Sequence, residues 1–317
     1  MVTRRRLSEA HIEVECRIKL FQAKWPVGFA CPRCGCGKYY LTARRQPLFE
    51  CASCRHMTSL TVGTVMEGSR TPLRKWFEAI RLLARTDQGT SAMELMRTIQ
   101  VTYKTAWLML HKLRYAMGQR EDRQLLTGLV RVNAARYGSP YNPSVYRHPK
   151  EHPLMSGASL NQNLDMTQLK IKPVPPEHCD DRVADRRWHR IFVEQHVDEA
   201  NSTVFGKVPK YGENRFQPLL QACRQMSRWL NDTFHGIGAK HLRAYADEFC
   251  CRYNLQLSAA DIGGHLIAIA AQHPRITYKS LVRRPKDGFS HSPYIRPVRQ
   301  ELFPRFSYED SRSSYIS

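Results

Sequence analysis

Cys31-Pro-Arg-Cys34 and, after sixteen residues, Cys51-Ala-Ser-Cys54 are two Cys-x-x-Cys pairs that decide the fold of the first part of the chain. Each pair presents two thiolates to one ion from a tight turn, and the residues between the pairs can return as a hairpin. The spacing predicts a zinc ribbon over 25–68, in which the four cysteines bind one structural Zn²⁺. Such a closed site supplies folding free energy to a segment too short for its own core.

The remaining cysteines do not share this spacing. A redox dithiol needs one Cys-x-x-Cys, not two at matched spacing, and a disulfide framework is typical of small secreted domains. Cys36 and His56 lie close in sequence to the expected ligands, and we interpret them as spare. The other five cysteines read as ordinary buried thiols: Cys16, Cys179, Cys223, Cys250 and Cys251.

Composition favours a polyanionic partner. The 317 residues include 49 Lys and Arg against 28 Asp and Glu, a formal net charge of +21. A surplus of this size favours nucleic acid first and an anionic membrane surface second. No run reaches the roughly 18 apolar residues of a spanning helix, and Met1–Arg6 leads into no apolar signal core. We therefore expect double-stranded DNA as partner and a cytoplasmic, nucleoid-associated protein without a membrane segment.

Three helices are expected after the ribbon. An apolar stripe at helical spacing marks the first, Ser91-x-x-Glu94 is a capping box that opens a second helix to about Ile99, and a third spans about 102–117. Tight turns join them, so the pattern predicts a helix-turn-helix DNA-binding domain over 69–120. The stripe consists of Leu73, Trp76, Phe77, Ile80 and Leu83.

The third helix has the two faces of a recognition helix. At 100° per residue its apolar side chains share one face, which we expect to pack on the other helices. The opposite face is basic or polar and lacks acids, as a surface that meets phosphates and base edges requires. A solvated helix in a generic three-helix bundle remains the alternative. The predicted DNA-binding residues are Lys104, Thr105, Leu108, Lys112 and Tyr115.

The rest of the chain is less regular. We expect a basic arm and helix over 1–24, an α/β domain over 126–284 and an irregular tail over 285–317. Strands are predicted at 128–132 and 167–174 and a helix over about 183–197, whereas 138–163 is rich in Pro, Tyr, His and Ser and shows no periodicity. The fold class is therefore multi-domain α+β.

Several further motifs point to a family. They are Trp25-Pro-Val-Gly-Phe-Ala-Cys-Pro-Arg-Cys-Gly, Phe49-Glu-Cys-Ala-Ser-Cys, Arg228–Gly236, Lys240-His-Leu-Arg-Ala-Tyr-Ala-Asp-Glu-Phe-Cys-Cys-Arg-Tyr-Asn254 and Ile276-Thr-Tyr-Lys-Ser-Leu281. With these motifs the chain resembles bacterial insertion-sequence transposases that combine an N-terminal zinc ribbon with an RNase H-like DDE domain and are related to the Merlin elements. The resemblance covers about two thirds of the chain and is strongest over 8–117. It also suggests a homodimer on paired DNA ends.

The resemblance implies two Mg²⁺ or Mn²⁺ ions for DNA cleavage and joining, held at three positions: two acids and a third residue that is often Asn, with Lys three residues later. In this chain those positions are substituted: Asn133 stands at the first, Gly206 or Lys207 at the second and Arg224 at the third, with Ser227 where a Lys is usual. The neutral amide of Asn133 can offer one oxygen but no charge, so it would neutralise two divalent ions poorly. Other acids could substitute, although their spacing identifies no triad: Asp180, Asp181, Asp185, Asp198 and Glu199.

Three functions fit these observations. The favoured one is a transposase-family, zinc-dependent DNA-binding protein whose catalytic centre is lost. The second is an active DDE transposase, an enzyme whose acids lie elsewhere in the middle of the chain. The third is a zinc-ribbon interaction module that binds RNA or an acidic protein through its basic surface.

Overall fold

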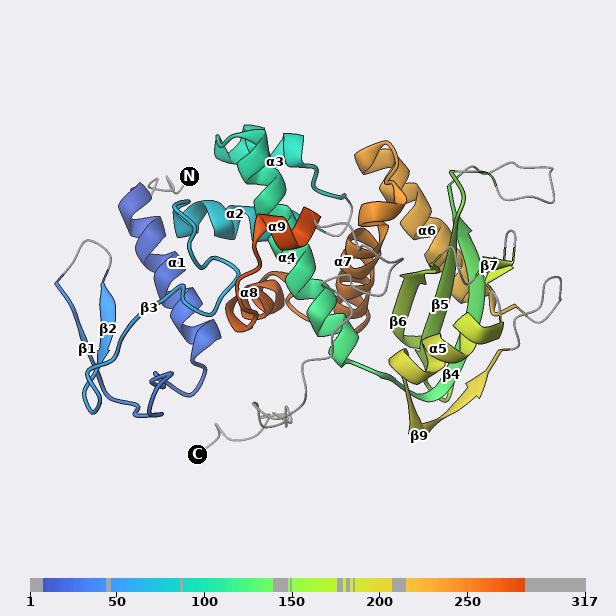
Figure 1. The fold of residues 1–317 in the computed structure, drawn as a ribbon, viewed down its shortest axis with the longest axis horizontal. Coiled ribbons are helices and arrows are strands. Elements are labelled where there is room, and N and C mark those ends of the chain that lie inside the picture. The colour runs from blue at the N-terminus through green and yellow to red at the C-terminus, as the bar shows by residue number, and fades with distance from the viewer. Residues whose placement is uncertain are drawn as a thin grey trace, which may run out of the picture.

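The computed structural model describes residues 8–43, 47–85, 88–138, 148, 150–175, 179–180, 183–184, 186–206 and 215–282. Figure 1 shows an elongated molecule with a small sheet at one end, a larger sheet at the other and a group of helices between them. None of the described helices is long and apolar enough to cross a membrane. Lys207 and the expected tail over 285–317 lie outside the described residues.

The N-terminal part is a helix followed by a small antiparallel sheet. Helix α1 (Glu9–Lys24) begins after Ser8, whose hydroxyl accepts the His11 N–H as an N-cap. Strands β1 (Tyr39–Leu41), β2 (Leu48–Cys51) and β3 (Met57–Ser59) pair in the order β1-β2-β3. This is the hairpin arrangement expected for a ribbon over 25–68.

The three expected helices are α2 (Leu73–Leu83), α3 (Ala92–Ile99) and α4 (Tyr103–Arg123). Ser91 caps α3 by accepting the Glu94 N–H, as the capping box predicts. Pro72 offers α2 no side-chain cap; instead Glu13 of α1 accepts the Leu73 and Arg74 N–H groups, each at 2.9 Å. A residue sixty positions away along the chain therefore fixes the start of α2.

The C-terminal helices return to this helical group. Helices α7 (Ala239–Leu257), α8 (Ile262–Gln272) and α9 (Tyr278–Val282) follow the large sheet in the chain, yet α8 packs on α1, α2 and α4. One core joins Leu20, Trp76 and Leu110 to Leu266 and Ile269. The helical unit is therefore built from two separate stretches of sequence, and its core crosses the boundary expected between 69–120 and 126–284.

The larger sheet has the strand order β6-β5-β4-β9. Strands β4 (Leu126–Tyr137), β5 (His152–Leu160) and β6 (Met166–Pro173) form an antiparallel meander, and β9 (Val197–Phe205) lies parallel to β4. Helix α5 (Arg186–His196) covers one face around Phe192, and α6 (Gln217–Phe234) and α7 cover the other. A short pair, β7 (Cys179–Asp180) and β8 (Val183–Ala184), completes the described strands.

Candidate zinc centre and nucleic-acid interface

Two matched turns hold the four cysteines. The Gly35 N–H donates to the Cys31 carbonyl at 2.9 Å, and the Arg55 N–H donates to the Cys51 carbonyl at 3.1 Å. The residue after each second cysteine has positive φ, 73° at Gly35 and 57° at Arg55. Both Cys-x-x-Cys segments therefore form the same knuckle, one with glycine at the left-handed position and one with arginine.

The four sulfurs converge on one point. Sγ of Cys31 lies 3.6 Å from Sγ of Cys54, and Sγ of Cys34 lies 3.5 Å from that of Cys51. All four lie within 4.8 Å of one another. Sulfurs about 2.3 Å from a tetrahedral zinc are ~3.8 Å apart, so this spacing fits a Cys₄ zinc shell. The Cys54 backbone N–H also lowers the pKa of the Cys51 thiol to about 6, which favours the thiolate that binds metal.

The spare groups stay outside the cluster. Sγ of Cys36 accepts the Lys38 N–H at 3.5 Å, and neither Cys36 nor His56 belongs to the group of converging sulfurs. This agrees with the sequence interpretation. The ion would therefore have four thiolate ligands and no open position for substrate, as in a structural site.

An aromatic cluster attaches the ribbon to α1. The ring of Phe49 on β2 lies 5.6 Å from that of Phe21 and 5.2 Å from that of Trp25, centroid to centroid. The Lys24 ammonium donates to the carbonyls of Leu60 and Val62, and burial lowers the pKa of Lys24 to about 8. The ribbon is thus tied to the helix that also caps α2.

Helix α4 differs from a recognition helix exposed along one side. Its first turn is accessible: Lys104 is exposed, and Thr105 is half-buried. Further along, Leu108 and Tyr115 are half-buried, because α3 packs on one side of α4 and α7 and α8 on the other. Among the predicted residues of α4, Lys104 in its first turn is therefore the one that is exposed. In helix-turn-helix proteins this end of the second helix also contacts base edges.

Lys112 does not fit the predicted DNA-binding face. Its side chain is buried, its Nζ donates to the Val65 carbonyl at 3.1 Å, and its ammonium lies 5.9 Å from the Trp76 ring centroid. The helical wheel places Lys112 opposite the apolar stripe, but the residues around Val65, after strand β3, and Trp76 of α2 cover that side. We therefore remove Lys112 from the interface.

Arg114 of α4 has a structural role. Its Nε lies 2.5 Å from Oε2 of Glu248 on α7, and both side chains are buried. Its guanidinium also lies 4.1 Å from the Tyr245 ring centroid. These contacts join α4 to α7. They were not predictable from local sequence, because the partners are 134 residues apart.

Two of the three positions that the resemblance gives for the metal site, Asn133 and Gly206, lie close together on the large sheet, and the third, Arg224, lies on α6. Asn133 lies on β4, Gly206 directly follows β9, and a Cβ added to Gly206 would lie 2.4 Å from the Val132 carbonyl oxygen. Asn133 donates its Nδ2 to the carbonyl of Phe216, which precedes α6, and Arg224 is an exposed residue of α6. Among the described residues these positions therefore hold an amide, a glycine and an arginine.

The acids considered as substitutes lie elsewhere or outside the described residues. Asp198 and Glu199 stand at the start of β9, next to the Leu126 end of β4. Asn133 is seven residues further along β4, a distance of roughly 23 Å at about 3.3 Å per residue. Asp181 and Asp185 lie outside the described residues, and Asp180 is the second residue of the short strand β7. Within the described part of the chain, the only metal-compatible group of His, Cys, Asp and Glu is the cysteine cluster.

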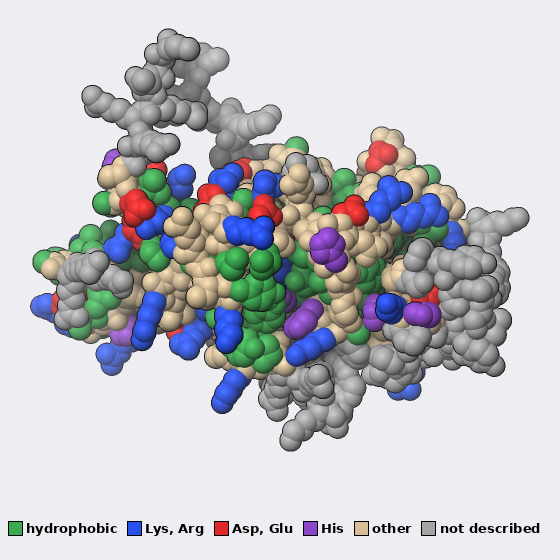
Figure 2. Space-filling view, turned by 90° about the horizontal axis from the view of Figure 1, so that it is seen from above, with side chains coloured by type: hydrophobic (Ala, Val, Ile, Leu, Met, Phe, Trp, Pro, Cys, Tyr) green, Lys and Arg blue, Asp and Glu red, His purple; other side chains and the backbone are tan. Residues whose placement is uncertain are grey.

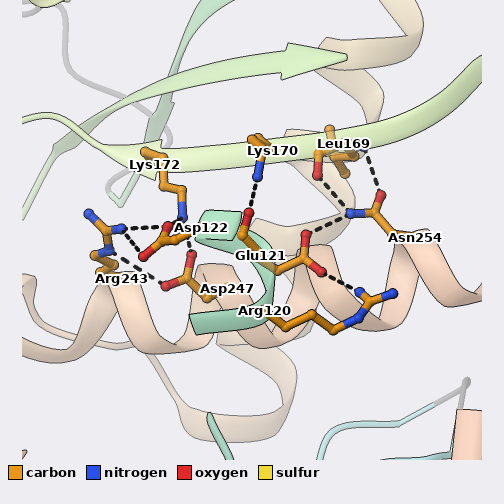
Figure 3. Close-up of polar contacts among 9 residues, drawn as sticks. All are labelled: Arg120, Glu121, Asp122, Leu169, Lys170, Lys172, Arg243, Asp247 and Asn254. Carbon is orange, nitrogen blue, oxygen red and sulfur yellow. Dashed lines mark hydrogen bonds and ion pairs between the residues drawn. The ribbon is translucent and has the colours of Figure 1, made fainter. Parts of the chain in front are cut away.

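Three acids do meet between α4, α7 and β6, but cations and an amide already bind them (Figure 3). Lys172 donates to Asp122 at 2.7 Å and to Asp247 at 2.6 Å, and Arg243 also pairs with Asp122. Burial tends to raise the pKa of Asp122, but Lys172 and Arg243 hold it below its ordinary value. Lys170 donates to the Glu121 carbonyl, and Asn254 donates to the Glu121 carboxylate. This cluster therefore joins α4 to the sheet and is not a metal site.

A comparison with family models matches residues 12–57 to the IS1595-type transposase zinc-ribbon domain. No curated protein and no solved structure matches the chain. The matched segment contains all four converging cysteines and most of α1. The N-terminal part of this chain is therefore similar to a transposase zinc-ribbon domain, and its four converging cysteines fit a structural zinc site.

Proposed function

We propose that this protein is a transposase-family DNA-binding protein in which zinc holds the N-terminal ribbon and the catalytic centre for DNA cleavage is lost. The observation that carries the proposal is the transposase-type ribbon with four converging thiols. The net charge of +21 adds support for a DNA partner. Loss of catalysis is our inference from the substituted positions on the sheet.

In this proposal the α3–α4 turn contacts the DNA. Lys104 is exposed in the first turn of α4, and Arg97 is exposed near the end of α3. Thr102 caps α4 and accepts the Thr105 N–H, which fixes the orientation of this turn. Cations on two adjoining helix ends suit phosphates that flank a major groove.

The large sheet would act as an RNase H-like scaffold. A meander followed by a strand parallel to its first member agrees with that fold, and Asn133 and Gly206 belong to its neighbouring strands β4 and β9 or their ends. Asn133 supports loss of catalysis for a physical reason. Its Nδ2 lies 3.0 Å from the Phe216 carbonyl oxygen, where a carboxylate would place two acceptors against each other.

The test is a gel-shift and cleavage assay with the zinc-loaded chain and labelled duplex DNA carrying the ends that flank the gene. We expect shifted, uncut DNA with either Mg²⁺ or Mn²⁺. Lys104→Ala should weaken binding and reduce the salt slope by about 0.9, because one phosphate contact is lost. The charge-matched control is Lys150→Ala, which removes an exposed lysine beyond the large sheet.

The remaining outcomes separate the alternatives. Nicked or joined DNA would show an active transposase with acids that we did not align. Binding that RNA or an acidic protein displaces, and that duplex DNA does not, would favour an interaction module. An unchanged salt slope for Lys104→Ala would remove the α3–α4 turn from the interface.

A further inference from the structure

Four ring side chains form a partly exposed surface where α4, α7 and α9 meet. Trp107 of α4 has its ring centroid 5.8 Å from that of His241 and 5.9 Å from that of Tyr278. Tyr103 lies one turn before Trp107 on α4, on the same side of the helix. Tyr278 is 58% exposed and Tyr103 48% exposed, an unusual state for large rings that could be buried. We call these four residues the α4–α9 aromatic surface.

Cations surround this surface, and acids are missing from the segments that build it. Residues 100–120, 235–246 and 273–282 contain no Asp or Glu. Lys104, Lys240 and Lys279 are exposed, and each is the immediate neighbour of a residue of the aromatic surface. In the space-filling view (Figure 2), apolar side chains near the middle of the molecule are bordered by Lys, Arg and His side chains. The surface therefore suits a ligand with both flat rings and negative charge.

The start of α7 adds a place for an anion. Gly238 caps this helix without a side-chain hydrogen bond, and the first turn holds no acid. Lys240 stands in that turn, where the positive end of the helix dipole favours an anion over a cation. The ring of His241, the residue after Lys240, lies 5.1 Å from the ring of His111. The buried Nε2 atom of His111 has no hydrogen-bond partner among the described residues.

We infer that the α4–α9 aromatic surface binds an unpaired base of DNA, which stacks on Tyr278 and Tyr103 while Lys104, Lys240 and Lys279 contact its neighbouring phosphates. The inference rests on the proposed DNA binding and extends it from duplex to single-stranded DNA. Aromatic side chains beside a basic track are the usual means of holding single strands, because every base offers a π-face. An acidic peptide would need the cations but not the exposed rings.

The experiment measures fluorescence anisotropy of the full zinc-loaded chain with two labelled DNAs, a blunt duplex and the same duplex with an oligothymidine overhang. We expect tighter binding to the overhang duplex. Tyr278→Ala should weaken that binding by about 5- to 100-fold, the effect of losing one stacked base. It should leave blunt-duplex binding unchanged.

Two variants serve as matched controls. Tyr278→Phe keeps the ring and should retain the overhang preference, whereas loss of binding here would mean that the hydroxyl and not stacking is used. Tyr40→Ala removes a 63% exposed tyrosine from the zinc ribbon and should have no effect. The melting temperature of each variant shows whether a loss of binding comes from a loss of stability. Tyr103→Ala provides a second test of the same surface.

The outcomes keep this inference apart from the proposed function. Blunt-duplex binding with no overhang preference, or an overhang preference that Tyr278→Ala and Tyr103→Ala both retain, overturns the inference and leaves the proposed function standing. Loss of blunt-duplex binding in the unmodified chain, with overhang binding kept, overturns the duplex proposal alone. Tighter binding of an oligouridine RNA than of oligothymidine would overturn the assignment to DNA.

Discussion

The Lys172 ammonium lies 2.6 Å from Oδ1 of Asp247, and both side chains are 1% exposed (Figure 3). Lys172 belongs to β6 and Asp247 to α7, and Asp122 at the end of α4 completes the group. A buried pair of this kind is costly to break, because the remaining charge loses its partner without regaining water. The junction between the helical unit and the sheet is therefore specified by charge as well as by apolar packing.

Lys172→Met tests that junction. The variant removes the buried ammonium between Asp122 and Asp247 and leaves them the partly exposed Arg243, so we expect the free energy of unfolding to fall by about 3–5 kcal/mol. Urea denaturation measures the change, and the double variant Lys172→Met, Asp247→Asn should recover part of it. Arg190→Ala, which removes an exposed pair with Glu194, should change stability by less than about 0.5 kcal/mol. A loss for Lys172→Met no larger than this control would contradict the prediction.

Removing zinc should unfold the ribbon. The purified chain should contain one zinc, and a strong chelator should release it and expose the aromatic cluster of Phe21, Trp25 and Phe49. Cys34→Ser should weaken zinc retention, because Cys34 is one of the four clustered cysteines. Cys36→Ser should not, because Cys36 lies outside the cluster. Metal analysis and tryptophan fluorescence follow both effects. Equal zinc loss in the two variants would show that Cys36 is a ligand.

The two knuckles differ in backbone strain. Arg55 has a φ of 57°, and replacement by glycine should stabilise the zinc-loaded ribbon by about 0.5–1 kcal/mol. Gly35→Ala should destabilise it by about 1 kcal/mol. Open space surrounds the added methyl at Gly35, so this loss would come from the backbone alone. The melting temperature should rise for Arg55→Gly and fall for Gly35→Ala. A shift in the same direction for both variants would exclude backbone strain as the explanation.

Glu13 should act as the N-cap of α2. Its carboxylate accepts two backbone N–H groups from Leu73 and Arg74, so Glu13→Ala should cost about 1.5–3 kcal/mol. Glu9→Ala is the control, because Glu9 is 78% exposed and pairs with the Arg74 side chain rather than with a backbone N–H of α2. Chemical denaturation compares the two, and similar small losses would show that Glu13 does not cap the helix.

The buried His111 predicts acid sensitivity. Burial holds the pKa of His111 far below its ordinary value near 6.5, so the folded chain keeps this ring neutral. Below pH 6.5 the unfolded chain binds a proton there and the folded chain does not, so stability falls as the pH falls. Between pH 7 and 4.5, the free energy of unfolding of the His111→Phe variant should fall by about 2 kcal/mol less than that of the unmodified chain. Equal losses in both chains would remove His111 as the cause.

Local signals predicted the local parts of the structure. The cysteine spacing predicted the ribbon, the capping box at Ser91 predicted the start of α3, and the apolar stripe predicted α2. Strand β5 was missed because eight of its nine residues are buried, so no alternation marks it. The burial of Lys112 was missed for a related reason: a helical wheel shows which face is apolar, not whether distant segments cover the other face.

The return of α8 to the first core has a consequence for synthesis. Leu266 and Ile269 complete a core that begins with Leu20 and Trp76, and the whole large sheet lies between them in the chain. A ribosome therefore releases the zinc ribbon and the sheet before it makes the helix that covers α1 and α2. Until about Gln272 has left the exit tunnel, the apolar side of α1 and α2 that α8 covers stays exposed to solvent. A nascent chain whose synthesis stops within the large sheet would therefore be a target for chaperones and proteases.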